Sequence, residues 1–221
     1  MTPTPTAANR TAALIASRVL EGAYRPGESL REIPLADELG VSRSTIREAL
    51  RILERDGVVR IEPHRGASVT QLSPEELIEI YQVRTVLLGL AMGLCAQRSS
   101  DREVLALQRL HQRMVKSIDD PRAAADGLHA RLSAEMALMI IDVAGNNRLR
   151  ELLTQMANQI ARYTRMGLSS PARRRQSAET WRAVIEAMSQ RDSTTAERLG
   201  RRLVTDTLRH ALGQFAGVLP E

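Results

Sequence analysis

Four polar side chains with nucleic-acid chemistry follow Ser42, within the first turn and a half of a predicted helix: Arg43, Ser44, Thr45 and Arg47. Arginine can form a bidentate pair with guanine, and short hydroxyls can reach base edges or backbone oxygens. The Ser42 hydroxyl is suited to accept a hydrogen bond from an unpaired N–H of the first helical turn. A helix N-terminus also favours phosphate. The segment therefore predicts a helix that contacts DNA.

The opposite side of this helix is apolar. Its apolar residues recur at spacings of three and four and mark a core face: Ile46, Ala49, Leu50 and Leu53. Arg51 and Arg55 continue the arginine row, and we interpret them as solvated side chains that pair with nearby acids.

Shorter elements flank this helix on both sides. A first short helix ends at Gly40, and two short strands are predicted over Val58–Ile61 and Ala67–Val69. Arg65 and Gly66 lie between the strands, where a basic side chain and a bare backbone suit contact with sugar-phosphate. The order of helix, turn, helix and hairpin predicts a winged helix-turn-helix.

The run GVSRSTIREALRILERDGVV over residues 40–59 resembles the GntR family of bacterial transcription regulators. A predicted helix over residues 11–21 and the turn at 24–27 extend the resemblance to residues 10–70. The resemblance implies operator contacts by Arg31, Ser42, Arg43, Thr45, Arg47 and Gly66.

The remainder of the chain has helical periodicity throughout. Ser73-Pro74-Glu75-Glu76 combines a cap, a proline and a glutamate three residues after the cap, so it predicts a helix start and a domain junction. We expect a disordered segment at 1–9, the winged helix-turn-helix at 10–72 and an all-helical domain at 73–221. The fold class is mostly α: three helices and a small β-hairpin, followed by a bundle of about six helices. Breaks are expected near residues 99–101, 119–121, 145–147, 169–171 and 192–193.

This second region resembles the FCD effector domain of FadR-like GntR regulators, and its helix count is similar to the VanR-type subgroup. Most FCD domains bind a metal ion through one aspartate and three histidines. Here those positions are occupied by residues that do not supply the imidazole and carboxylate ligands: Ser133, Ala137, Trp181 and Leu203. We therefore expect no metal or other cofactor. Joint ligation by Asp126 and His129, three residues apart, is an alternative metal site.

Without a metal, an effector would be held by shape and apolar contact. Trp181 would form one wall, and Met136, Met139 and Ala137 would line the cavity, because methionine adapts to irregular ligands. Arg84 would pair with an anionic group. The alternative is that Trp181 and the methionines fill the former metal cavity and leave no room for a ligand.

Composition limits the function classes. The chain of 221 residues has a formal net charge of +5, yet acidic and basic residues nearly balance up to Leu72, so bulk charge is weak evidence for DNA binding. No stretch of 18 to 20 uncharged apolar residues and no hydrophobic signal core is present, which predicts a cytoplasmic protein without membrane contact. The single cysteine, Cys95, is interpreted as a buried structural thiol. No phosphate loop or nucleophile–histidine pair favours an enzyme.

Together these patterns predict a homodimeric transcription regulator, with a repressor expected over an activator. It would bind a palindromic double-stranded operator and respond to a small-molecule effector in the helical domain. A constitutive DNA-binding protein, whose helical domain serves only dimerisation, is the alternative.

Overall fold

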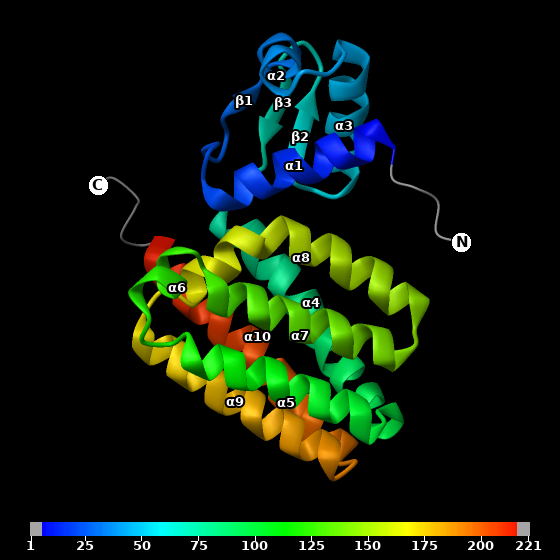
Figure 1. Cartoon of the computed structure of the whole chain (residues 1–221), viewed down its shortest axis with the longest axis vertical. Coiled ribbons are helices and arrows are strands. Elements are labelled where there is room, and N and C mark those ends of the chain that lie inside the picture. Colours follow the sequence, from blue (N-terminus) through cyan, green and yellow to red (C-terminus); the bar gives the residue numbers. More distant parts are fainter. Residues whose placement is uncertain (1–5, 216–221) are drawn as a thin grey trace. The chain divides into compact units, whose positions relative to one another are not determined.

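The computed structural model describes residues 6–215 of the chain (Figure 1). Two compact units make up the chain, residues 1–72 and residues 73–221. The expectation of disorder over residues 1–9 is wrong in its last part, because the first helix begins at Ala7 after a cap by the Thr6 side chain. Residues 1–5 lie outside the described residues.

The N-terminal unit contains three helices and a three-stranded antiparallel sheet with the strand order β1-β3-β2. The predicted hairpin therefore has a third strand, because Ser29 and Leu30 pair with Ser68 and Ala67. The elements are α1 (Ala7–Glu21), β1 (Ser29–Leu30), α2 (Glu32–Leu39), α3 (Arg43–Arg55), β2 (Val59–Glu62) and β3 (Gly66–Val69).

The core of this unit forms around α3, against which α1 and α2 pack. The predicted core face of α3 is confirmed, since Ile46, Ala49, Leu50 and Leu53 are all buried. The larger apolar side chains of α1 are not all buried. Ile15 is buried, whereas Leu14 and Leu20 are 46% and 45% exposed. The buried face of α1 is instead Ala8, Thr11, Ala12 and Ile15, a set with helical period that includes small residues.

Helix α2 begins earlier than the proline in its sequence suggests. Its first residue is Glu32, so Pro34 occupies the third helical position. The N–H of that position also lacks a partner within a helix, and proline therefore removes no hydrogen bond. Gly40 ends the helix with a left-handed φ of 64°, a conformation that glycine adopts without steric cost.

The C-terminal unit is all-helical, with seven helices among the described residues. They are α4 (Pro74–Arg98), α5 (Asp101–Lys116), α6 (Pro121–Ala125), α7 (Leu128–Ala144), α8 (Asn147–Gly167), α9 (Pro171–Ser189) and α10 (Ser193–Phe215). All five predicted breaks coincide with helix boundaries. The additional break is at Gly127, whose φ of 66° separates α6 from α7. The predicted capping box is present, because Ser73 and Glu76 exchange hydrogen bonds at the start of α4.

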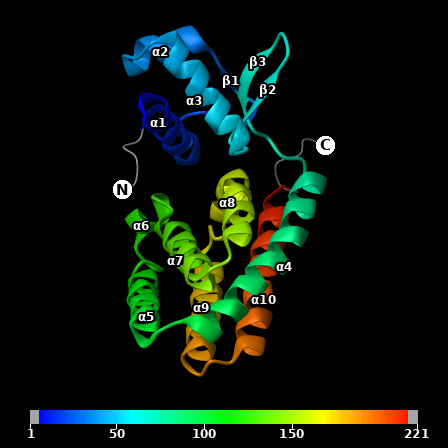
Figure 2. The ribbon, with the colours of Figure 1, turned by 90° about the vertical axis from the view of Figure 1, so that its right-hand side faces the viewer.

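Helices α4 and α10 lie side by side along much of their length (Figure 2). Glycines permit this close approach: a Cβ on Gly89 would lie 2.7 Å from Arg201 Cγ, and one on Gly200 would overlap Met92 Sδ. Cys95 of α4 is fully buried, and burial raises the pKa of its thiol to about 12. The interpretation of Cys95 as a buried thiol is thus confirmed.

Helix α4 is also long and apolar enough, by length and composition, to cross a membrane. Its most apolar window has a mean hydropathy of 1.4, and 39% of that window is buried within the protein. A core helix of a water-soluble protein has the same properties, so the pattern alone does not indicate a membrane.

Candidate nucleic-acid interface and ligand cavity

The start of α3 is organised by hydroxyl groups. The Thr45 backbone N–H donates to Ser42 Oγ at 3.1 Å, which confirms the predicted cap. The same oxygen lies 2.8 Å from Ser44 Oγ and 2.8 Å from Thr45 Oγ1. Ser42 and Ser44 are both exposed, so this group of bonded hydroxyls lies at the surface.

The two arginines of this surface differ in their surroundings. Arg43 is exposed. Arg47 has a side chain that is 56% exposed, and its Nε and Nη2 donate to Glu32 Oε1 and Oε2 at 2.9 and 2.8 Å. The bond from Arg47 lowers the pKa of Glu32, and the charge of Arg43 adds to the effect. Both arginines thus lie on the solvent side of α3, opposite its core face, and one of them is held by a carboxylate.

Glu32 is the residue that sequence reasoning missed. It opens α2, fifteen positions before Arg47, so no spacing within one helix could indicate the contact. The packing of α2 on α3 brings the two side chains together.

The remaining predicted DNA contacts are all on the surface. Arg31 is exposed at the N-cap position of α2, where its side chain makes no capping bond. Arg65 is 83% exposed and its Nη1 lies 3.3 Å from Glu62 Oε2. Gly66 and His64 have φ values of 79° and 66°, so the turn between β2 and β3 uses two left-handed residues. Their contacts with DNA stay predictions.

In the helical unit, a hydrogen bond joins two of the four positions that the resemblance assigns to the family's metal ligands. Trp181 of α9 is 2% exposed, and its Nε1 donates to Ser133 Oγ of α7 at 3.1 Å. Ala137 on α7 and Leu203 on α10 are both buried. An indole and a hydroxyl therefore occupy a place where the resemblance predicted a former metal site.

The other predicted effector residues have defined surroundings. Met136 is fully buried on α7. Arg84 is half-buried, and its Nη1 donates to the Leu153 carbonyl at 3.3 Å. Burial lowers the pKa of Arg84, against a smaller opposing effect of Tyr81. This guanidinium therefore retains donors for an anionic group, although one is directed at a backbone carbonyl of α8.

Metal-ligand side chains are sparsely grouped. Within residues 6–215, no group of three or more His, Cys, Asp or Glu side chains is placed to hold a metal ion. The alternative metal ligands, Asp126 and His129, lie in different environments. Asp126 is exposed at the end of α6, whereas His129 is 3% exposed. The lack of a bound metal stays a prediction.

Comparisons with known proteins agree with this division. Residues 7–69 match the family described as "Bacterial regulatory proteins, gntR family", and residues 79–206 match the FCD domain. An uncharacterized HTH-type transcriptional regulator of Bacillus subtilis, YdhC, is 32% identical over 67% of this chain and 65% of its own length. The chain thus spans just under two thirds of that relative. A probable D-xylose utilization operon transcriptional repressor of Paenarthrobacter nicotinovorans is 25% identical, over 87% of this chain and 83% of its own.

A solved structure shows the same fold. E. coli McbR/YncC superposes with a TM-score of 0.80 at 19% identity, and the alignment covers 96% of this chain and 100% of that one. The matched families and relatives are transcription regulators and not enzymes, in agreement with the sequence-based expectation.

Proposed function

Because this chain belongs to the GntR family of bacterial regulatory proteins and carries an FCD domain, we propose that it is a homodimeric transcription regulator. It binds a double-stranded operator in the cytoplasm and represses transcription. The relative named as a repressor supports this direction of control. Two identical heads related by a two-fold axis present the same helix to two half-sites, which favours a palindromic operator.

The main support for DNA binding is the structure of the α3 N-terminus. A capped helix start displays exposed hydroxyl and guanidinium groups, while the opposite face is locked into the core by Ile46 and Leu53. A helix held by one face can place its other face in the major groove without losing its packing. The N-terminal N–H groups add affinity for phosphate.

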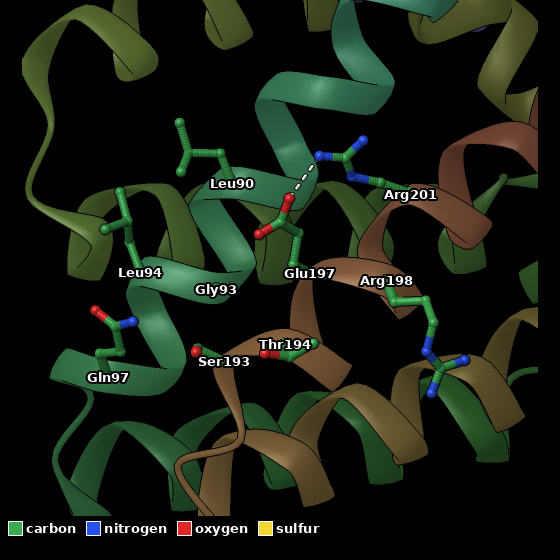
Figure 3. Close-up of a pocket in the computed structure, with 9 residues that line it drawn as sticks. All are labelled: Leu90, Gly93, Leu94, Gln97, Ser193, Thr194, Glu197, Arg198 and Arg201. Atoms are coloured by element: carbon green, nitrogen blue, oxygen red, sulfur yellow. Dashed lines mark hydrogen bonds and ion pairs between the residues drawn. The ribbon is translucent and has the colours of Figure 1, made fainter.

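The dimer is proposed to form through α4 and α10 of the helical unit. Val83, Val86 and Leu90 follow one face of α4 and are 48%, 50% and 40% exposed. The face continues into a groove of about 380 Å³, where Leu90 and Leu94 lie opposite the Glu197–Arg201 ion pair of α10 (Figure 3). A two-fold axis through such a patch would place its apolar residues against the same residues of a second copy.

Control by an effector is the finer part of the proposal. In this proposal the buried Trp181, Met136 and Ala137 would supply an apolar wall, with Leu203 and Ser133 beside it, and Arg84 would supply a charge for an anionic group. A ligand that favours one spacing of the two heads would shift the protein away from the DNA-binding form, by no more than its differential affinity for the two states.

The second candidate is constitutive DNA binding without an effector in this cavity. The hydrogen bond between Trp181 and Ser133 favours it, because each group then satisfies the other without a ligand. Intrinsic fluorescence separates the two candidates, since the chain has a single tryptophan and its emission reports on the surroundings of Trp181. A metabolite library that leaves both the emission and the melting temperature unchanged supports the constitutive protein.

DNA binding is tested with the full chain. Selection from random duplex DNA should yield a palindromic site, and Arg43→Ala or Arg47→Ala should weaken its binding by about 1 to 3 kcal/mol and relax base preference. Arg51→Ala, an exposed arginine further along α3, is the matched control and should bind as the parent does. Parental affinity of both test variants would refute the assignment of α3.

The dimer is tested by sedimentation. Leu90→Glu places a charge in the proposed interface and should give monomers, whereas Leu105→Glu on α5, a leucine that is 52% exposed, should stay dimeric. If the Leu90→Glu protein is still a dimer, the interface does not include this face of α4.

A further inference from the structure

A second, smaller cavity lies where α6, α7, α8 and α9 meet, and its volume is about 110 Å³. Its polar lining comes from His129, Arg165, Ser169 and Arg174. None of the described residues that line it is an aspartate or glutamate. The cavity is therefore basic, and it shares no lining residue with the Trp181 wall.

His129 is the unexplained group of this cavity. Its side chain is buried, with the residue only 3% exposed, and neither ring nitrogen has a hydrogen-bond partner in the described structure. Buried side-chain nitrogens in folded proteins almost always have a partner. Two unsatisfied nitrogens on one ring that lines a cavity therefore indicate a missing ligand.

The two guanidinium groups that line the cavity with His129 donate to backbone carbonyls. Arg174 donates from Nε and Nη2 to the Ile118 carbonyl at 3.2 and 2.9 Å, and from Nη1 to the Ser169 carbonyl at 2.5 Å. Arg165 donates to the Ala125 carbonyl. These carbonyl oxygens orient the guanidinium groups, and a carbonyl carries no net charge that would neutralise a cation.

The start of α7 adds to the same positive field. This helix of 17 residues begins after Gly127, and no side chain caps its first turn. Gly127, His129 and Ala130 of that turn line the cavity. The N-terminus of α7, with the positive end of its helix dipole, thus lies at the cavity beside the imidazole.

Gly127 also controls the position of a cation. Its φ is 66°, and a Cβ there would lie 3.0 Å from Arg165 Nε. Because glycine has no side chain, the Arg165 guanidinium can lie directly against the helix start. Three features from separate elements therefore converge: a helix N-terminus, two guanidinium groups and an unsatisfied imidazole.

We infer that this cavity binds a small oxyanion, the carboxylate or phosphate group of a metabolite. The oxygens accept hydrogen bonds from the His129 ring and from the first turn of α7, and their charge compensates Arg165 and Arg174. Anion binding is independent of the proposed DNA-binding function. Only the role of the anion as an effector rests on that function.

The site also couples binding to protonation. Burial, together with the smaller effects of Arg174, Arg173 and His111, lowers the pKa of His129 to about 4. The charged groups that act on the ring are therefore Arg173 and Arg174 on α9 and His111 on α5, with Arg165 of α8 across the cavity. A bound anion opposes these charges, so His129 takes up a proton on binding. Affinity for sulfate, whose charge is constant in this range, should rise from pH 7.5 to pH 5.5.

The direct test is a titration of the full chain with labelled histidine, followed by NMR. The chain has four histidines, and His64 in the N-terminal unit is an internal control. Inorganic phosphate and acetate are added separately, each against sodium chloride at equal ionic strength. A saturable shift of the His129 resonance, without one at His64, is expected. The anion that produces it distinguishes a phosphate ligand from a carboxylate ligand.

Variants identify the groups involved. His129→Leu and Arg165→Met should each weaken binding by about tenfold or more, because each removes a charge-assisted or directional contact. His210→Gln on α10 removes a histidine of the same unit outside the cavity and is the matched control. If His129→Leu does not fold, the anion affinity of the Arg165→Met protein, measured from its His129 resonance, tests the inference.

Two results would overturn the inference: no saturable His129 shift with either anion, or unchanged affinity in Arg165→Met. Operator binding is measured in parallel on the same samples. Intact anion binding without any DNA affinity would refute the regulator and leave the anion site in place, and the reverse result would refute the anion site alone.

Discussion

The guanidinium of Arg47 lies against the carboxylate of Glu32, with Nε and Nη2 at 2.9 and 2.8 Å from the two oxygens. The pair joins the start of α2 to the exposed face of α3, which is the proposed DNA-contacting surface. The two side chains are 56% and 29% exposed, so the pair adds little to stability. Its consequence is geometric, because a bidentate contact restricts a long side chain to one orientation.

The substitution Glu32→Gln is expected to reduce discrimination between operator and random DNA by roughly fivefold, or about 1 kcal/mol. Arg47 loses its fixed orientation, and binding to random DNA strengthens because a carboxylate is removed near phosphates. Competition binding at fixed salt measures the ratio. Glu54→Gln, an exposed acid later in α3, is the control. An unchanged ratio would show that Glu32 does not position Arg47.

Stability of the helical unit should decrease on acidification. The pKa of His129 is about 4 in the folded protein, below the ordinary value of 6.5, so the unfolded chain binds more protons between these values. The contribution of the neutral His129 ring to the free energy of unfolding is therefore complete above pH 6.5 and is lost as pH falls towards 4. Urea unfolding followed by Trp181 fluorescence should give a free energy about 2 kcal/mol lower at pH 5 than at pH 7.

His129→Leu should reduce that loss, because leucine does not titrate. The same variant removes two unsatisfied buried nitrogens, so it should be at least as stable as the parent at pH 7. A pH dependence equal to that of the parent protein would assign the titration to other groups.

The metal content of the purified protein tests the alignment that places non-ligating residues at the family's metal-ligand positions. Gentle purification should yield a protein without stoichiometric zinc, nickel or manganese by elemental analysis. The combined substitution Ser133→Asp, Ala137→His, Trp181→His and Leu203→His should then create binding of about one ion, if the positions converge as the resemblance implies. Near-stoichiometric metal in the parent protein would contradict the register.

Close helix packing predicts opposite effects of two similar substitutions. A Cβ on Gly167, at the end of α8, would lie 2.5 Å from the Thr207 carbonyl oxygen of α10. Gly167→Ala should therefore destabilise the helical unit by about 1 to 3 kcal/mol. Gly213→Ala has no atom within 4 Å of the new carbon and should leave stability unchanged or raise it by up to about 1 kcal/mol. Thermal unfolding measures both, and equal effects would contradict this packing.

Local signals in the chain were sufficient for most of the helix boundaries. Ser42 and Ser73 are caps because their hydroxyls satisfy N–H groups three residues away, which needs no distant partner. The missed break at Gly127 is instructive. A lone glycine inside a helical pattern is compatible with continuation of the helix, whereas in the folded chain the left-handed φ of 66° at Gly127 separates α6 from α7.

Sequence patterns by themselves determined the winged head, the helical second domain and the arginine face of α3, because hydrophobic period and capping act over a few residues. Tertiary structure alone decided that Glu32 holds Arg47 and that Trp181 bonds to Ser133. It also decided that the buried His129 ring, in a cavity lined by two arginines, has no hydrogen-bond partner among the described residues. Each of these contacts joins residues from different elements or depends on burial. Their energies arise from desolvation and orientation, which are set only when helices pack.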